Sequence, residues 1–86
     1  MLKIKLSKPE YIYLCHAVFL QKRHRETLFS AQQISDVHLV NISEDQAGEI
    51  RDLCSEQLQI AGFDEKYELT SEGKILESLI DKFFIG

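Results

Sequence analysis

The 86-residue sequence is poor in several residue types on which specialised folds and sites depend. It has no tryptophan, one proline and four glycines, and the glycines stand far apart at positions 48, 62, 73 and 86. Glycines so separated form no glycine-rich phosphate loop, so a nucleotide-binding fingerprint is excluded. No apolar run approaches the roughly 18 residues of a membrane span. The first ten residues lack the apolar core and cleavage site of a secretory signal, so we expect a cytoplasmic protein.

Cysteine and histidine are also scarce. Cys15 and Cys54 are the two cysteines, and each stands among apolar residues of an expected helix, so we expect reduced, buried thiols. Neither cysteine has a second ligand at the short spacing of a metal site, and His16, His24 and His38 show no helical ligand spacing. We therefore expect no bound metal or cofactor. A site built from His16, His38 and nearby acids stays open as an alternative.

Catalytic constellations are missing too. Nucleophilic catalysis needs a Cys or Ser facing a base, but Cys15 and His16 are neighbours, and neighbours on a helix do not face each other. Paired acids stand at expected helix starts and turns, where solvated carboxylates are common: Glu44/Asp45, Asp64/Glu65 and Glu68/Glu72. Acid–base catalysis instead needs two carboxylates in a shielded cleft. We expect no enzymatic activity.

The net charge of −4 is distributed unevenly along the chain. Residues 1–25 contain six Lys or Arg and one Glu, a balance of +5. Residues 26–86 contain thirteen acids and four bases, a balance of −9. Because charge decides which surfaces attract each other, residues 1–25 should attract acidic partners and residues 26–86 should attract basic partners.

The amino-terminal quarter has clear strand and helix signals. Apolar and polar residues alternate through 1–7, which predicts a half-buried strand, and its lysines suit a sheet edge. Ser7 and Glu10 match a capping box, and Pro9 suits a first helical turn. The pattern predicts a helix from there to about Lys22.

The next segment is less regular. If a helix ends near Lys22, the basic run KRHR at 22–25 lies at its carboxyl end, where cations complement the helix dipole. Ser30 with Gln33 is consistent with the start of a short helix. The β-branched run VHLVNI at 37–42 predicts a second strand.

The following segment, SEDQ at 43–46, is another capping-box pattern and predicts a helix over 44–61. Its expected buried stripe is Ala47, Ile50, Leu53, Cys54, Leu58 and Ala61. Gly62 should end this helix in a Schellman-type stop, with Phe63 folded back on Leu58.

The last quarter predicts a short extended piece at 66–69 and a final helix capped by Thr70 or Ser71. The expected buried face of that helix is Ile75, Leu76, Leu79, Ile80, Phe83 and Phe84. These elements predict a single α+β domain over 1–86, with three main helices and two or three short strands. Their expected order is β-α-(α)-β-α-β-α.

The segment GFDEKYELTSEGKILESLID resembles the closing strand and helix of winged-helix DNA-binding domains. The matching positions are Gly62, Leu69, Thr70, Gly73 and the apolar stripe Ile75, Leu76 and Leu79. The resemblance implies a winged-helix-like core and, as an alternative function, transcriptional regulation with Lys22, Arg23 and Arg25 binding DNA. Two features depart from the family. The helix in the reading position is acidic, and only three residues separate Phe63 from Tyr67, which leaves no room for a basic wing.

The same segment is similar to the tails of small uncharacterised bacterial proteins, some of toxin–immunity type. This similarity and the charge distribution predict a non-catalytic module that binds a basic protein, as an inhibitor or immunity protein would. The expected partner-binding residues are Glu44, Asp45, Glu49, Asp52 and Glu56. The apolar end of the chain, Phe83, Phe84 and Ile85, could pair two copies in a homodimer.

Overall fold

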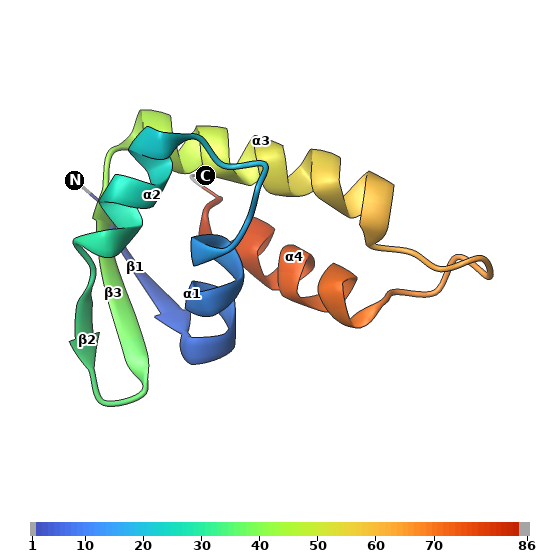
Figure 1. Cartoon of the computed structure of the whole chain (residues 1–86), viewed down its shortest axis with the longest axis horizontal. Coiled ribbons are helices and arrows are strands. Elements are labelled where there is room, and N and C mark those ends of the chain that lie inside the picture. Colours follow the sequence, from blue (N-terminus) through green and yellow to red (C-terminus); the bar gives the residue numbers. More distant parts are fainter. Residues whose placement is uncertain (1, 85–86) are drawn as a thin grey trace.

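The computed structural model describes residues 2–84. Its elements, in chain order, are β1 (Leu2–Ser7), α1 (Lys8–Cys15), α2 (Lys22–Phe29), β2 (Gln32–Ile34), β3 (Val37–Ile42), α3 (Glu44–Ala61) and α4 (Ser71–Lys82). The predicted α+β class is confirmed, with four helices and a three-stranded antiparallel sheet in these residues. Figure 1 shows the sheet at one end of the molecule and the loop between α3 and α4 at the other.

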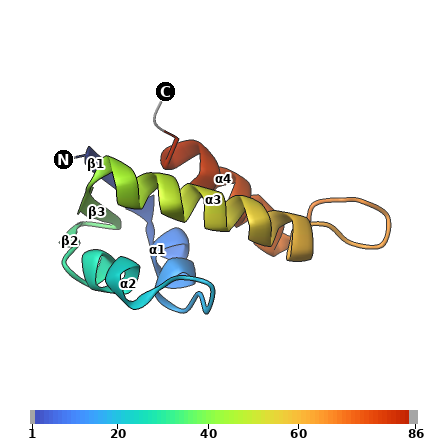
Figure 2. The same cartoon turned by 90° about the horizontal axis from the view of Figure 1, so that it is seen from above.

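The sheet has the order β1-β3-β2, so the predicted edge position of β1 is confirmed. Alternation places Leu6 and Val40 on the inner face, where both side chains are fully buried. The helices lie against this face, as both views show (Figure 1, Figure 2). The register pairs Lys5 with Leu39 and Ser7 with Val37 on the opposite, outer face.

The predicted helix up to Lys22 is wrong, because α1 ends at Cys15 and a new helix begins at Lys22. The connecting segment is not helical, and it buries Ala17 and Leu20. Side chains of α2 satisfy the backbone freed by this break. The Arg25 guanidinium donates to the carbonyl of Ala17 at 2.7 Å, and the backbone N–H of Gln21 donates to His24 Nδ1 at 3.2 Å.

The basic run at 22–25 therefore begins α2 instead of ending the previous helix, and the predicted dipole complementarity is wrong. The short helix predicted from Ser30 is wrong as well, since Ser30 ends α2 and β2 follows. β2 and β3 form a hairpin whose two turn residues are Ser35 and Asp36, with Ser35 in the left-handed region at φ 58°. The strand over 37–42 is confirmed as β3.

The predicted bounds of α3 are confirmed, and Ser43 caps it by accepting from the backbone N–H of Gln46 at 3.2 Å. The Schellman stop is wrong: Gly62 has φ −83°, outside the left-handed region, and Phe63 is 45% exposed. A Cβ on Gly62 would instead lie 2.3 Å from the Leu58 side chain, and the close helix crossing explains a different glycine, Gly73. A Cβ on Gly73, in the first turn of α4, would lie 2.2 Å from the carbonyl oxygen of Gly62.

Thr70 is confirmed as the cap of α4. Its hydroxyl oxygen accepts from the backbone N–H of Gly73 at 3.0 Å. The same hydroxyl donates to the carbonyl oxygen of Ala61, also at 3.0 Å. The extended piece predicted at 66–69 is reduced to a single bridge between Phe63 and Leu69, so the observed order is β-α-α-β-β-α-α. The two long helices α3 and α4 lie side by side (Figure 2).

Candidate functional site: the solvent face of α3

The outer surface of α3 carries three exposed carboxylates in one row. Asp45, Asp52 and Glu56 are separated by seven and four residues, which are the spacings of one helix face. All three side chains lie on the face opposite to the buried Ile50 and Cys54. At 1.5 Å per residue the row extends for about 16 Å. We call Asp45, Asp52 and Glu56 the acidic stripe.

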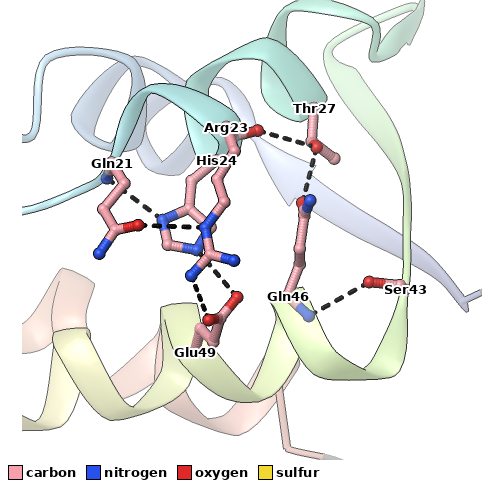
Figure 3. A network of polar contacts seen from close by, with 7 residues as sticks. All are labelled: Gln21, Arg23, His24, Thr27, Ser43, Gln46 and Glu49. Atoms are coloured by element: carbon pink, nitrogen blue, oxygen red, sulfur yellow. Dashed lines mark hydrogen bonds and ion pairs between the residues drawn. The ribbon is translucent and has the colours of Figure 1, made fainter.

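Two further predicted binding residues are not counted in the stripe, for different reasons. Glu44 is exposed, but it points about 100° away from the stripe around the helix axis. Glu49 stands on the same helix face as the stripe, but it is engaged within the chain: it forms an ion pair with Arg23, and its Oε1 lies 3.3 Å from His24 Nε2 (Figure 3). Burial raises the pKa of Glu49, but the hydrogen bond from His24 and the charge of Arg23 outweigh this and lower it.

His24 is the buried centre of this joint between α2 and α3. Its side chain is 1% exposed, and its Nδ1 accepts the backbone N–H of Gln21 (Figure 3). The proton of a neutral imidazole must then sit on Nε2, which donates to Glu49. A second link joins the Thr27 hydroxyl to Gln46 Oε1 at 2.6 Å. Together these contacts hold α2 against the amino-terminal half of α3.

Sequence reasoning missed this joint because it placed 22–25 at the end of a helix. A signal was present: Gln21 and His24 have the three-residue spacing of a capping pair, and in the structure His24 caps the backbone of Gln21.

The residues expected to bind DNA are largely occupied. Lys22 is exposed at the amino end of α2, whereas Arg23 is paired with Glu49 and Arg25 donates to the carbonyl of Ala17. Phosphate binding depends on cations that are free to contact the backbone of the nucleic acid. Arg25 is therefore committed to a contact within the chain, whereas Lys22 and the 51% exposed Arg23 side chain stay accessible.

The histidines and cysteines do not gather into a site. His16 Nδ1 lies 3.0 Å from the carbonyl oxygen of Ile12, and the His38 ring stacks on Tyr11 with centroids 3.9 Å apart. Within residues 2–84 no three His, Cys, Asp or Glu side chains converge as metal ligands would. Both cysteines are free thiols, and burial raises the pKa of Cys54 to about 12, so this thiol is not ionised at neutral pH.

The residues expected to form a homodimer surface differ in their exposure to solvent. Phe83 is fully buried, while Phe84 is 63% exposed and lies with its ring centroid 5.8 Å from the Arg51 guanidinium. Ile85 lies outside the described residues. In the part of the chain that the structure describes, no helix is both long and apolar enough to cross a membrane.

Comparison with protein-family models, curated proteins and solved structures finds no match for this chain. The resemblances of residues 62–84 to winged-helix and immunity-type proteins therefore stay predictions. Function has to be argued from the geometry described above.

Proposed function

We propose that this chain is a small protein-binding module without chemistry of its own, and that its acidic stripe docks a basic protein partner. The supporting observation is the stripe itself, three exposed carboxylates in a row on a long helix. Asp52 pairs with Arg51, whose Nη2 lies 3.3 Å from Asp52 Oδ1. The Asp52 side chain is still 70% exposed. An exposed pair of this kind is weak and can be exchanged for a partner's cation.

The stripe lies on a rigid support. α3 packs against α4 along its buried face, and the joint around His24 fixes its amino-terminal half to α2. A fixed row of charges steers an oppositely charged protein toward it and sets the orientation of docking, so association should be fast and sensitive to salt. An inhibitor or immunity protein that covers a cationic surface is the most specific form of this proposal. Two free thiols suit a reducing compartment such as the cytoplasm.

The test begins with capture of partners from a lysate of the source organism on the immobilised chain. A captured protein is identified, purified and titrated against two charge variants. In the first, Asp52→Lys is combined with Glu56→Lys on the stripe. In the matched control, Glu77→Lys is combined with Asp81→Lys, which makes the same change of +4 at exposed positions of α4.

The proposal predicts that the stripe variant weakens binding about 10- to 100-fold and flattens its salt dependence, while the control binds nearly as wild type. Glu49 is left unchanged, because its substitution would disturb the joint with α2. If both variants weaken binding equally, only net charge matters and the assignment to the stripe is wrong.

DNA binding is the second candidate function. One observation favours it: α2 follows α1 and presents Lys22 at its exposed amino end, where a recognition helix carries its base-contacting residues. Titration of random duplex DNA at increasing salt separates the two functions. A DNA-binding chain loses affinity with a log–log slope of about −0.9 for each phosphate contact. An absence of binding at low salt removes this candidate.

A further inference from the structure

The loop between α3 and α4 is built as a rigid projection. We call residues 63–68 the finger. Its base is closed by the bridge between Phe63 and Leu69, and Asp64 organises its interior. Asp64 Oδ1 accepts the backbone N–H groups of Lys66 at 2.8 Å and Glu68 at 3.0 Å, and the Asp64 N–H donates to the carbonyl of Glu68 at 2.9 Å. Figure 2 shows this loop extending beyond the ends of both helices. The finger is thus held in one shape before any partner arrives.

Tyr67 is the unusual residue of the finger. Its φ is 61°, in the left-handed region that glycine or asparagine usually occupies, and its side chain is 87% exposed. Glycine or asparagine adopts this conformation with less strain, so Tyr67 lowers the stability of the fold relative to those residues. Aromatic side chains that stand exposed on rigid supports are frequent anchors of protein interfaces. Phe63, which is 45% exposed, adds a second apolar side chain nearby.

The outer face of the sheet complements the finger in both charge and apolar surface. Strand register places Lys5 beside Leu39, and Ile34 beside Val37, on this uncovered face. These four side chains line a shallow hollow of about 330 Å³. Lys3 is the next residue of β1 that points to the same face. Within the three described strands, no acidic residue stands at an outward-facing position. The face is apolar and positively charged on a chain whose net charge is −4.

We propose that the finger of one copy docks on the outer sheet face of a second copy, with Tyr67 over the hollow and Glu65 and Glu68 against Lys3 and Lys5. The two surfaces match in chemistry: an aromatic ring with carboxylates meets an apolar hollow with ammonium groups. The finger carries three acids and one base, a balance of −2, whereas the outward positions of β1 carry two lysines.

The two surfaces also lie at opposite ends of a molecule that is 38 Å long and 27 by 25 Å across (Figure 1). One copy can therefore use both at once. The contact is heterologous, so successive copies join head to tail, in rings where the rotation between copies closes and in open chains where it does not. The finger is small compared with a standard interface of about 800 Å² per partner, so we expect weak association that is populated only at high protein concentration.

Sedimentation velocity of the purified chain tests the association directly. The weight-average mass should rise above the 10.0 kDa of one chain as the concentration approaches about 1 mM, and should return to 10.0 kDa in high salt, which screens the charges. Tyr67→Gly should abolish the rise. Because glycine relieves the left-handed strain, this variant should melt at the same or a higher temperature than wild type, so loss of association cannot be attributed to unfolding.

A mixing experiment distinguishes this contact from any other. Tyr67→Gly removes the aromatic side chain of the finger and keeps the sheet face intact. Lys3→Glu combined with Lys5→Glu reverses the charge of the sheet face and keeps the finger intact. Each variant alone should stay at 10.0 kDa, and their mixture should form complexes that reach twice this mass and stop there.

Three outcomes would overturn the proposal. The wild-type chain could stay at 10.0 kDa at every concentration. It could associate while the variants associate equally well, which would assign self-association to another surface, such as the end of α4 with Phe84. The mixture could also fail to form the paired complex. The test uses no second protein and leaves the acidic stripe unchanged, so its result is independent of the proposed function.

Discussion

Acidification should destabilise this protein chiefly through Glu10, the buried carboxylate with the larger lowering of its pKa. Its side chain is 7% exposed and forms an ion pair with Lys82, while Ser78 donates to Glu10 Oε2 at 2.5 Å. The Ser7 backbone N–H donates to Oε1 at 2.8 Å, so the carboxylate joins the start of α1 to the end of α4. Burial alone raises the pKa of Glu10, but the hydrogen bonds from Lys82, Ser78 and Ser7 outweigh it and lower the pKa to about 2.

The size of the effect follows from this shift. The pKa falls from an ordinary 4.5 to about 2, and each unit corresponds to about 1.4 kcal/mol, so ionised Glu10 stabilises the fold by about 3 kcal/mol. The folded state binds this proton less readily than the unfolded state. The contribution is therefore complete above pH 4.5 and is lost as the pH falls toward 2.

Urea unfolding from pH 7 to pH 2 measures this term in wild type, in Glu10→Gln and in the exposed control Glu65→Gln. The difference in unfolding free energy between wild type and Glu10→Gln should be about 3 kcal/mol at pH 7 and should shrink toward zero at pH 2. The control should follow wild type at every pH. A constant difference between wild type and Glu10→Gln across this range would refute the reasoning, because Glu10 would then stabilise the fold without a lowered pKa.

The remaining predictions are also measured by unfolding. Gly73→Ala should lower stability by about 1 to 3 kcal/mol, because its Cβ would lie 2.2 Å from backbone at the end of α3; an unchanged melting temperature would contradict that crossing. Gly48→Ala, with nothing within 4 Å, should raise stability by about 0.5 to 1 kcal/mol, and a loss would show a hidden contact. Ser35→Gly should raise it by up to about 1 kcal/mol, since a left-handed first turn position favours glycine; a lower melting temperature would exclude that turn. Glu49→Gln should lower the melting temperature more than Glu56→Gln, and equal effects would contradict the joint with α2.

Strand alternation and helix-capping residues correctly predicted several parts of the fold from the sequence. The alternation in 1–7, the cap at Ser43 and the cap at Thr70 each correspond to an observed element boundary. These signals work because a strand's alternation or a helix cap depends on residues close in sequence. They predicted the bounds of α3 without any knowledge of its neighbours.

The errors occur where distant contacts decide the structure. The break after Cys15 is accompanied by the burial of Ala17 and Leu20 and by a hydrogen bond from Arg25, eight residues away, to the carbonyl of Ala17. β2 is a strand because β3 lies beside it, since a three-residue segment has little strand preference of its own. Gly62 looked like a left-handed helix stop from its position, but its φ is −83°, and a Cβ there would lie 2.3 Å from the Leu58 side chain of its own helix.

The structure locates the five acidic residues that the sequence singled out, and their role in binding stays a prediction. Helical spacing brings Asp45, Asp52 and Glu56 together, as the sequence indicated. The use of Glu49 depends on His24, which lies 25 residues earlier and whose helix was misplaced. A pairing across that distance requires the fold to be known.

The ratio of two dissociation constants tests the proposed function most directly. The purified partner is titrated against the stripe variant, which combines Asp52→Lys with Glu56→Lys, and against the α4 variant, which combines Glu77→Lys with Asp81→Lys. A docking site on the acidic stripe predicts a ratio of about 10 to 100, with both variants melting near the wild-type temperature. A ratio close to one would contradict it.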